Sequence, residues 1–314
     1  MMRAFVFPGQ GAQKIGMGKS LAEAYPESRV VFEEVDAALG ENLSDLVWNG
    51  VPEALMLTQN AQPALMATSI AALRALESEG LGMNRASFVA GHSLGEYSAL
   101  CAAGALSLAD TALLLRIRGK AMQQAVPVGI GAMAALVGLD FSVASEVAEE
   151  AAQGEVCQAA NDNDPAQVVV SGHLGAVTRA LDIAKARGAK RALLLPVSAP
   201  FHCALMRPAA DVMAQALADV TITSPLVPLV SNVRAAAVTD PDEIRELLVA
   251  QITGSVRWRE SVLWMEQASV TEYWEIGAGK ALSGMIKRIA MSPTLQAIET
   301  PDDVVLARNQ ENKS

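Results

Sequence analysis

The first 127 residues of the chain combine short apolar runs with longer stretches in which apolar positions recur at helical spacing. Short runs are typical of buried strands, and spacing of three or four residues is typical of helices that pack along one face. Strands are therefore expected at residues 4–7 and 87–90, and helices at residues 20–39, 61–79, 96–105 and 110–124. This mixture predicts a domain of the α/β class.

A different order of elements begins after Pro127. Strands are expected at residues 132–137, 155–159, 167–171 and 190–197, helices at 142–153 and 176–187, and a turn at Asn161, Asp162, Asn163 and Pro165. The order βαββαβ is that of a ferredoxin-like unit. We therefore predict that residues 128–197 form an inserted small subdomain. Residues 1–127 and 198–314 would then form one larger subdomain with a parallel sheet.

The pattern of the larger subdomain resumes after residue 197. Strands are expected at residues 228–232 and 272–276, and helices at residues 244–251 and 258–267. The polar tail after Pro301 is expected to be frayed. The longest uncharged stretch, from Ala121 to Leu139, is interrupted by Gln, Pro and Gly residues. We interpret it as a helix end, a hinge and a strand instead of a membrane span.

Composition narrows the class of protein. Hydrophobic residues make up 51% of the chain and charged residues 18%, a balance that excludes a disordered protein. The formal net charge of −10 would repel nucleic acid and anionic lipid, and no strong basic patch offsets it. We therefore expect neither a nucleic acid nor a membrane as a partner.

The start of the chain and its cysteines point to an intracellular compartment. The first residues lack the apolar core and cleavage site of a secretory signal. Cys101, Cys157 and Cys203 are too widely spaced for a disulfide framework or a metal motif. We expect a monomeric cytoplasmic protein with reduced thiols and no metal.

The strongest local motif is Gly91-His92-Ser93-Leu94-Gly95, which lies between an expected strand and an expected helix. In that setting a G-x-S-x-G turn exposes the serine hydroxyl, and the start of the following helix directs N–H groups at the same point. The alternative is that five residues match by chance. We predict that Ser93 is a nucleophile.

A serine nucleophile needs a base, and the chain has three histidines. His92 adjoins the serine, so its side chain should leave the turn in another direction and pack. His173 falls at a turn of the insertion and is expected at the surface. His202 follows the insertion, where the chain returns to the main sheet, and we favour it as general base over a purely structural histidine. No acidic third member of a triad is apparent, and a backbone carbonyl would suffice to orient the base.

One arginine of the helix at residues 110–124 is a candidate for burial. Arg118 shares a stripe with Leu114 and Met122, whereas Arg116 aligns with Ala112 and Lys120. A buried guanidinium needs a carboxylate, which either a substrate acid or an internal salt bridge would provide. The sequence leaves both possibilities open.

Several further segments, in this order, carry a resemblance to a known family. They are residues 7–11 (Phe-Pro-Gly-Gln-Gly), 91–96, 118–120, 161–172, 201–206 (Phe-His-Cys-Ala-Leu-Met), 231–233, and Gln251 ahead of 256–258. Together they resemble the malonyl-CoA:acyl carrier protein transacylases of type II fatty acid synthesis along nearly the whole chain. The resemblance implies a large α/β-hydrolase-like subdomain, an inserted ferredoxin-like subdomain, and an active site between them.

The resemblance also implies a role for particular residues. Ser93 would attack the thioester of malonyl-CoA, with His202 as base and then acid, and the backbone carbonyl of Gln251 would orient His202. The N–H groups of Gln10 and Leu94 would form the oxyanion hole. The family assigns the malonate carboxylate to Arg118, and the bulky Phe201 before the histidine goes with malonyl over branched substrates. No metal or redox cofactor is implied, since CoA and phosphopantetheine enter as parts of the substrates.

The implied partner, an acyl carrier protein, is acidic in this family, so docking would need a local basic surface. Lys185, Arg187, Lys190 and Arg191 cluster in the insertion, and Lys287-Arg288 form a second group. Both groups are equally compatible with ordinary solvated charge.

Two rival functions use the same motifs: a serine esterase or thioesterase that passes the acyl group to water, and a catalytically silent binding subunit. Arg118 and Gln10 argue against the first, and the Ser93 and His202 pair argues against the second.

Overall fold

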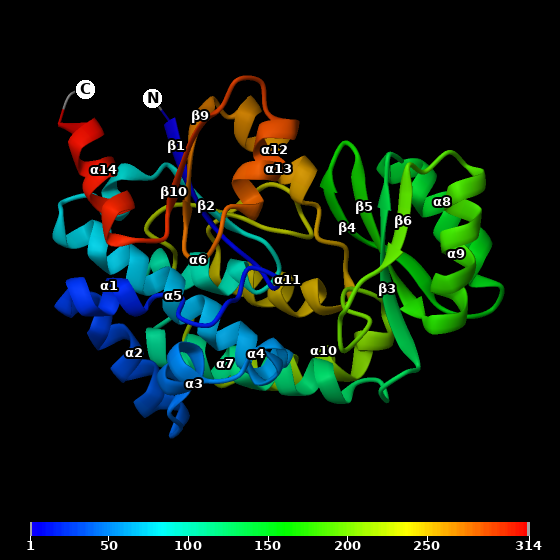
Figure 1. Ribbon diagram of the computed structural model, residues 1–314, viewed down its shortest axis with the longest axis horizontal. Coiled ribbons are helices and arrows are strands. Elements are labelled where there is room, and N and C mark those ends of the chain that lie inside the picture. The colour runs from blue at the N-terminus through cyan, green and yellow to red at the C-terminus, as the bar shows by residue number, and fades with distance from the viewer. Residues whose placement is uncertain (1, 313–314) are drawn as a thin grey trace.

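Within the residues that the computed structural model describes, 2–312, the larger lobe is built on a six-stranded sheet (Figure 1). The strand order is β10-β9-β1-β2-β7-β8. The strands are β1 (Met2–Phe7), β2 (Phe88–Gly91), β7 (Leu229–Val230), β8 (Ala237–Val238), β9 (Val270–Ile276) and β10 (Thr294–Ile298). Neighbouring strands run parallel, except that β7 and β8 are antiparallel.

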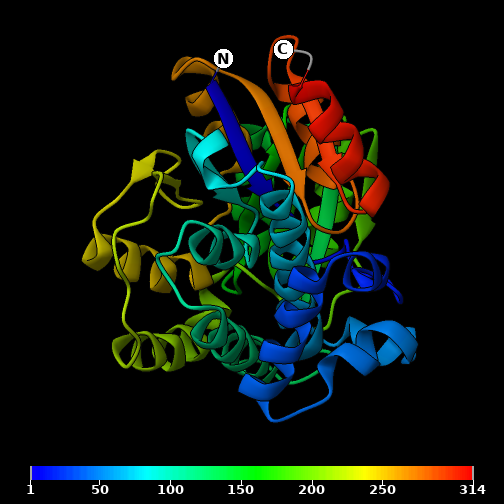
Figure 2. The ribbon, with the colours of Figure 1, turned by 90° about the vertical axis from the view of Figure 1, so that its left-hand side faces the viewer.

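Helices cover both faces of this sheet, which explains the continuous apolar runs of its central strands. In β1, Phe5 and Phe7 face one hydrophobic core, whereas Ala4 and Val6 face another. The helices are α1 (Lys19–Ala24), α2 (Pro26–Leu39), α3 (Leu43–Asn49), α4 (Pro52–Met56), α5 (Thr58–Ser78), α6 (Gly95–Ala102), α7 (Leu108–Gln124), α10 (Arg207–Ala218), α11 (Pro241–Thr253), α12 (Trp258–Gln267), α13 (Ala281–Ile289) and α14 (Pro301–Glu311). Helix α5 packs against α2 and α7, and Figure 2 shows α14 alongside β10. Among the described helices, none has the length and apolar character needed to cross a bilayer.

The smaller lobe, green in Figure 1, contains a separate antiparallel sheet with strand order β4-β5-β3-β6. Its elements follow the order βαββαβ along the chain: β3 (Gly131–Val137), α8 (Phe141–Ala152), β4 (Cys157–Asp164), β5 (Gln167–His173), α9 (Leu174–Ala186) and β6 (Arg191–Leu194). Helices α8 and α9 cover one face of the sheet. The predicted α/β class, with a parallel sheet and an inserted antiparallel one, is confirmed. The boundaries at 128 and 197 stay a prediction.

Strand β4 joins the small lobe to the large one. The N–H of Asp162 donates to the carbonyl of Val256 at 2.9 Å, which extends the small sheet by a bridge to the segment before α12. The buried carboxylates of Asp162 and Asp164 pair with Arg259 and Arg288 at 2.8 and 2.7 Å. The predicted turn is confirmed at Pro165, which lies between β4 and β5, and is wrong at Asn161, Asp162 and Asn163. These polar residues lie in the strand, where irregular register lets them face the large lobe.

The predicted single helix at residues 20–39 is wrong, because the chain breaks at Tyr25. This residue is extended, and Pro26 begins α2 as its first residue. Proline has no N–H to donate to the preceding turn and disfavours helical backbone in the residue before it. The sequence therefore starts a new helix at a position where the apolar pattern alone continues.

The predicted frayed tail after Pro301 is also wrong for the described residues, and its last two residues, 313 and 314, lie outside them. Residues 301–311 form α14, and Thr300 and Asp303 form a reciprocal capping box at its start. Val304 and Ala307 are buried against the main core. The tail is polar on average, but two small apolar positions at helical spacing and a good cap are enough to dock it.

Candidate active site

The turn at Ser93 has the geometry of a nucleophile elbow. Strand β2 ends at Gly91, α6 begins at Gly95, and Ser93 between them has a φ of 55°, in the left-handed region. A Cβ atom at Gly91 would lie 2.0 Å from the backbone of Gly95, and one at Gly95 would lie 2.2 Å from the carbonyl oxygen of Phe7. The two glycines are therefore required for the close turn that projects the serine hydroxyl.

Asn232, which follows β7, holds the elbow in this shape. Its Oδ1 accepts the N–H of Ser93 at 2.8 Å, and its Nδ2 donates to the carbonyl of Gly91 at 2.6 Å. The side chain is fully buried. A strained backbone persists only when its surroundings fix it, and these two bonds supply that constraint.

The structure brings together Ser93, His202 and Gln251. The Oγ of Ser93 lies 2.7 Å from Nε2 of His202, and Nδ1 of His202 lies 2.9 Å from the carbonyl oxygen of Gln251. That carbonyl belongs to the last turn of α11, where the helix leaves carbonyl groups without an internal partner. Since a carbonyl only accepts, it fixes the proton on Nδ1 and leaves Nε2 free to accept the serine proton.

His202 is held as a neutral base. Its side chain is buried, and its φ of 58° also lies in the left-handed region. Burial, together with the positive charge of Arg118, lowers the pKa of His202 to about 3. The imidazole is therefore uncharged at physiological pH, with its Nε2 unprotonated.

Arg118 lies beside the serine with neutral partners only. Its Nη1 donates to Oε1 of Gln62 at 2.8 Å, and its Nη2 donates to Oε1 of Gln251 at 2.7 Å and to Oγ of Ser93 at 3.1 Å. It is 1% exposed, and burial lowers its pKa, but a guanidinium keeps its proton in proteins. No described carboxylate forms an ion pair with it. A buried cation without an anion next to the nucleophile is suited to binding an anionic substrate group.

The neighbouring Arg116 serves the fold instead. The spacing of apolar residues along the helix indicated burial for Arg118 and not for Arg116, yet Arg116 is also buried. It contacts the side chains of Glu41 and Asn60 and the backbone carbonyl of Gln59. These partners neutralise its charge within the large lobe. The internal salt bridge that the sequence left open for Arg118 is thus formed by Arg116.

The backbone N–H groups of Gln10 and Leu94 lie at the start of the loop after β1 and at the start of α6. Neither N–H donates to another described residue. The Gln10 side chain accepts a hydrogen bond from Thr58 at 2.8 Å, which holds the loop against α5. Free N–H groups at a helix start favour developing negative charge.

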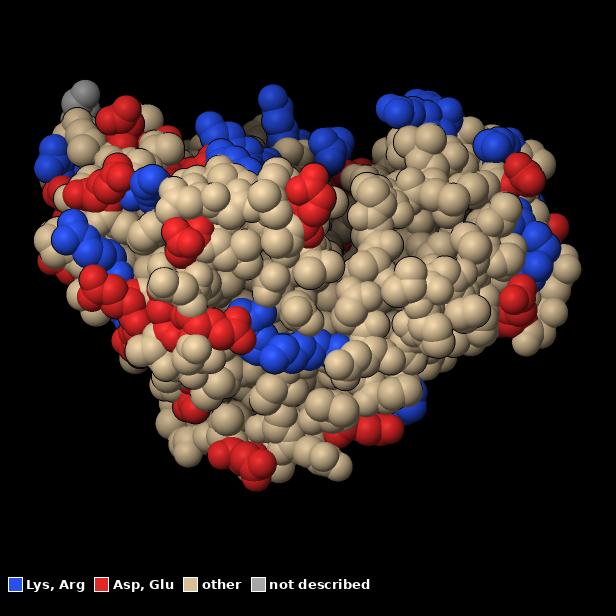
Figure 3. Space-filling view, turned by 60° about the horizontal axis from the view of Figure 1, so that its bottom comes forward, with Lys and Arg blue, Asp and Glu red and all other residues tan. Residues whose placement is uncertain are grey.

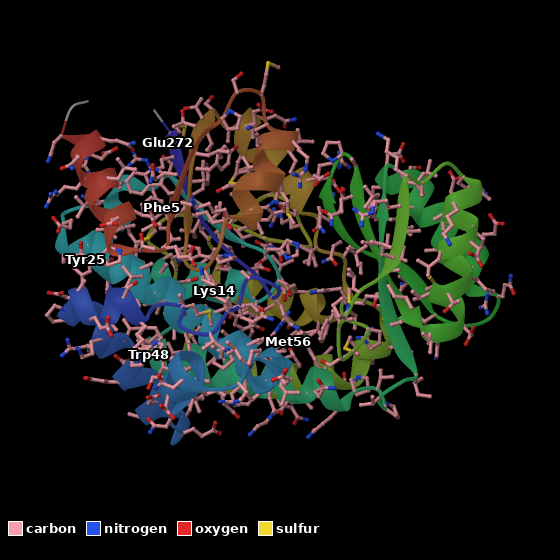
Figure 4. All side chains as sticks on the ribbon, in the orientation of Figure 1. Phe5, Lys14, Tyr25, Trp48, Met56 and Glu272 are labelled. Carbon is pink, nitrogen blue, oxygen red and sulfur yellow. The ribbon has the colours of Figure 1, made fainter. Side chains whose placement is uncertain are left out.

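Ser93 opens into a cleft of about 810 Å³ between the lobes. The hollow is visible in Figure 3, and Figure 4 shows Met56, one of its lining residues, at the end of α4. The small lobe contributes the uncovered face of its sheet through Met133, Val169 and Leu195. Phe201, 8% exposed, lines the cleft next to His202.

The side chains of the other two histidines form hydrogen bonds elsewhere and not with Ser93. The Nε2 of His92 lies 2.9 Å from Oδ1 of Asn163 in β4, and its ring packs near Trp258. His92 also lines the cleft, so it does more than the packing that the sequence predicts. His173 ends β5, where its Nδ1 accepts the N–H of Val156 within the small lobe.

Sequence reasoning missed four contributors to the site: Gln62, Glu96, Asn232 and the side chain of Gln251. Glu96 and Asn232 lie inside the segments that carry the family resemblance, but their residue types alone indicate no role. Gln62 gives no signal beyond a polar side chain on a buried helix stripe. A buried polar residue on an otherwise apolar face requires a partner, and that requirement is the signal that could have found it.

A serine on an elbow, a neutral histidine bonded to it, and free N–H groups nearby define an enzyme that moves acyl groups. A family model described as the acyl transferase domain matches residues 4–274. The chain is an acyltransferase.

Relatives identify the family more narrowly. The chain is 47% identical over 304 residues to the malonyl CoA-acyl carrier protein transacylase of Escherichia coli (strain K12), covering 97% of this chain and 98% of that one. The crystal structure of acyl-carrier-protein-S-malonyltransferase from Bartonella henselae matches with a TM-score of 0.97 and 53% identity, over 99% of this chain and 100% of that one. A structure of a type II PKS acyl-carrier protein in complex with its malonyl-transacylase matches with a TM-score of 0.95 and 42% identity, over 99% and 100%. The chain belongs to the malonyl-CoA:acyl carrier protein transacylase family.

Proposed function

We propose that this enzyme transfers the malonyl group of malonyl-CoA to the phosphopantetheine thiol of an acyl carrier protein through a malonyl ester on Ser93. The observation that carries the proposal is the guanidinium of Arg118, 3.1 Å from the serine oxygen and without a carboxylate partner. An acyl group that ends in a carboxylate would supply that partner through two parallel hydrogen bonds. The names of the relatives support the same substrate pair.

The first half-reaction uses the Ser93 and His202 pair. The proton of Ser93 Oγ moves to Nε2 of His202 as the oxygen attacks the thioester carbonyl. The tetrahedral oxyanion is stabilised by the N–H groups of Gln10 and Leu94. When the C–S bond breaks, His202 returns the proton to sulfur and CoA leaves as a thiol.

The second half-reaction reverses these steps with a different thiol. The phosphopantetheine thiol gives its proton to His202, its sulfur attacks the ester carbonyl, and the C–Oγ bond breaks. Ser93 Oγ then regains the proton from His202. The proposed cycle needs no metal or redox cofactor, and CoA and phosphopantetheine enter as parts of the substrates. The ring of Phe201 beside the base favours an unbranched malonyl group.

Intact-protein mass spectrometry tests the proposal against a hydrolase. After exposure to a mixture of acyl-CoAs, the protein is expected to gain the mass of one malonyl group and to lose it when holo acyl carrier protein is added. The acyl group should appear on the carrier protein. Release of free malonate at the same rate without carrier protein would identify a thioesterase instead.

Truncation of Gln10 and Leu94 is expected to have little effect on turnover, because their proposed role uses backbone N–H groups. Leu94→Ala and Gln10→Ala should each lower kcat less than about tenfold, against roughly 10²–10³ for the loss of an oxyanion donor. Leu94 is 1% exposed, so its truncation should still lower the free energy of unfolding by about 2–5 kcal/mol and, with it, the melting temperature. Steady-state kinetics and thermal melts measure the two effects separately. A loss of 10² or more in kcat in either variant would assign the role to the side chain.

The structure divides the basic residues that could dock the carrier protein. Lys185 pairs with Asp182, and Arg187 pairs with two glutamates of α8. Lys190 and Arg191 are exposed and form no ion pair with a described residue. Figure 3 shows Lys and Arg side chains on both rims of the cleft. We propose that an acidic carrier protein docks on the surface that carries Lys190 and Arg191.

Charge reversal tests this docking surface. Lys190→Glu with Arg191→Glu is expected to raise the KM for carrier protein about tenfold, because exposed charges act on protein association. The KM for malonyl-CoA should stay within about twofold. The matched control is Lys185→Glu with Arg187→Glu, which changes the net charge equally at paired residues. An unchanged carrier KM in the first variant, or equal effects in both, would reject this surface.

A further inference from the structure

Glu96 is a fully buried carboxylate at the start of α6, three residues after the nucleophile. Its Oε1 accepts the backbone N–H of Asn232 at 3.3 Å, and its Oε2 accepts Nε2 of Gln251 at 2.5 Å. No arginine or lysine among the described residues forms an ion pair with it. The nearby charge of Arg118 favours the ionised form, but a buried carboxylate without a direct ion pair is costly, so Glu96 calls for an explanation beyond packing.

The carboxamide of Gln251 has hydrogen-bond acceptors around its nitrogen and a donor at its oxygen. Its Nε2 is surrounded by three oxygens: Glu96 Oε2 at 2.5 Å, the Ser93 carbonyl at 2.9 Å and Asn232 Oδ1 at 3.4 Å. Its Oε1 accepts Nη2 of Arg118 at 2.7 Å. A flipped amide would set an N–H against the guanidinium and an oxygen against three oxygens. One orientation of Gln251 is therefore strongly preferred.

We propose that Glu96 is a positioning residue that fixes the orientation of the Gln251 carboxamide and, through it, holds Arg118 toward the acyl carboxylate. The inference rests on the proposed function of Arg118. Glu96 touches neither the reacting atoms nor the guanidinium, and Gln251 is the link. The backbone carbonyl of Gln251 separately orients His202, so one residue connects the base to the carboxylate-binding group.

An ionised carboxylate suits this role because it has acceptors and no donor. Its two oxygens accept the N–H groups of Asn232 and Gln251, and the side chain of Ser231 is a further donor beside them. A glutamine at position 96 would keep the size but would turn an NH₂ group toward one of these donors. If that group met Nε2 of Gln251, the amide of Gln251 would flip to restore the hydrogen bond and would present its own NH₂ to Arg118.

The decisive variant is Glu96→Gln, assayed with malonyl-CoA and acetyl-CoA as alternative donors. Malonyl transfer is expected to fall about 10- to 100-fold in kcat/KM, because a misdirected guanidinium no longer aligns the carboxylate. Acetyl transfer, which needs no carboxylate contact, should change less than about threefold and so reports an intact fold and an intact Ser93 and His202 pair. Equal losses for both donors would overturn the proposal.

Gln251→Ala provides the second test, since it removes the carboxamide and keeps the backbone carbonyl on His202. If Glu96 acts through that carboxamide, Glu96→Gln should cause no further loss of malonyl transfer in the Gln251→Ala background. Independent, multiplying losses would overturn the proposal. Arg118→Ala serves as the reference. If Arg118→Ala fails to discriminate malonyl from acetyl, the proposed function of Arg118 has failed, whereas discrimination there and none in Glu96→Gln rejects Glu96 alone.

A pH profile separates positioning from packing. Burial raises the pKa of the Glu96 carboxyl to about 7, with the hydrogen bonds from Gln251 and Asn232 acting in the opposite direction. Of the charged or titratable neighbours, Arg118 keeps its proton, burial keeps Tyr97 neutral, and His202 titrates only near pH 3. Malonyl transfer is therefore expected to rise as pH increases from 6 to 8 and to lose this rise in Glu96→Gln. Persistence of the same rise in the variant would contradict the role of Glu96.

Discussion

Replacing Ser93 with alanine is expected to lower malonyl transfer about 10⁴-fold or more and to leave the protein without a covalent malonyl group. The substitution removes the only atom to which the acyl group would be attached in the proposed cycle. Residual turnover would come from binding and from the N–H groups of Gln10 and Leu94, acting on direct attack by the second thiol. Intact-protein mass spectrometry after exposure to malonyl-CoA measures the covalent step.

The elbow itself should survive this change. Asn232 bonds to the backbone of residues 91 and 93, so alanine keeps both contacts and the melting temperature should change little. The matched control is Ser98→Ala. Ser98 is a buried serine on α6, the helix that follows the elbow, and its Oγ has no hydrogen-bond partner among the described residues. It should retain full activity and labelling. A malonyl label that persists in Ser93→Ala would place the acyl group on another residue and reject the mechanism.

The sequence could identify the chemically reactive residues because their constraints are local or few. Five consecutive residues specify the elbow at Ser93, and two of them are glycines at positions where a Cβ would clash. The base had to come from three histidines, and His202 was chosen by its position after the insertion. The structure places it 2.7 Å from Ser93. The order of elements likewise predicted the four strands of the small sheet and β1, β2, β7 and β9 of the large one, because most of them are short apolar runs bounded by turn residues, but it did not predict β8 or β10.

The parts that could not be predicted depend on contacts between distant segments. Asn161 to Asp164 have the composition of a turn, but they pair with β5 as a strand, and ion pairs to α12 and α13 and the bridge to Val256 compensate their buried polar groups. Glu96 meets its partner Gln251 across 155 residues of sequence. A single sequence does not indicate the role of a polar side chain that becomes buried. Their function becomes visible only when donors and acceptors are matched in space.

Arg118→Ala is expected to separate malonyl from acetyl transfer more strongly than any other single change. Removing one partner of a buried, hydrogen-bonded ion pair costs about 3–5 kcal/mol, which corresponds to roughly a 10²- to 4 × 10³-fold loss in kcat/KM for malonyl-CoA. Acetyl-CoA presents no carboxylate, so its transfer should fall less than about tenfold, through loss of the 3.1 Å contact to the serine oxygen. Steady-state kinetics with both donors gives the ratio directly.

Two further arginine variants show which property of Arg118 matters. Arg118→Lys keeps the charge but loses the two-pronged geometry, so its malonyl transfer should lie between wild type and Arg118→Ala. Arg116→Ala removes a buried arginine two positions away that is bonded to Glu41, Gln59 and Asn60. It should lower the melting temperature and leave the malonyl-to-acetyl ratio unchanged. Equal losses for both donors in Arg118→Ala would mean that the guanidinium supports the serine alone, and the substrate carboxylate would then need another binding group in the cleft.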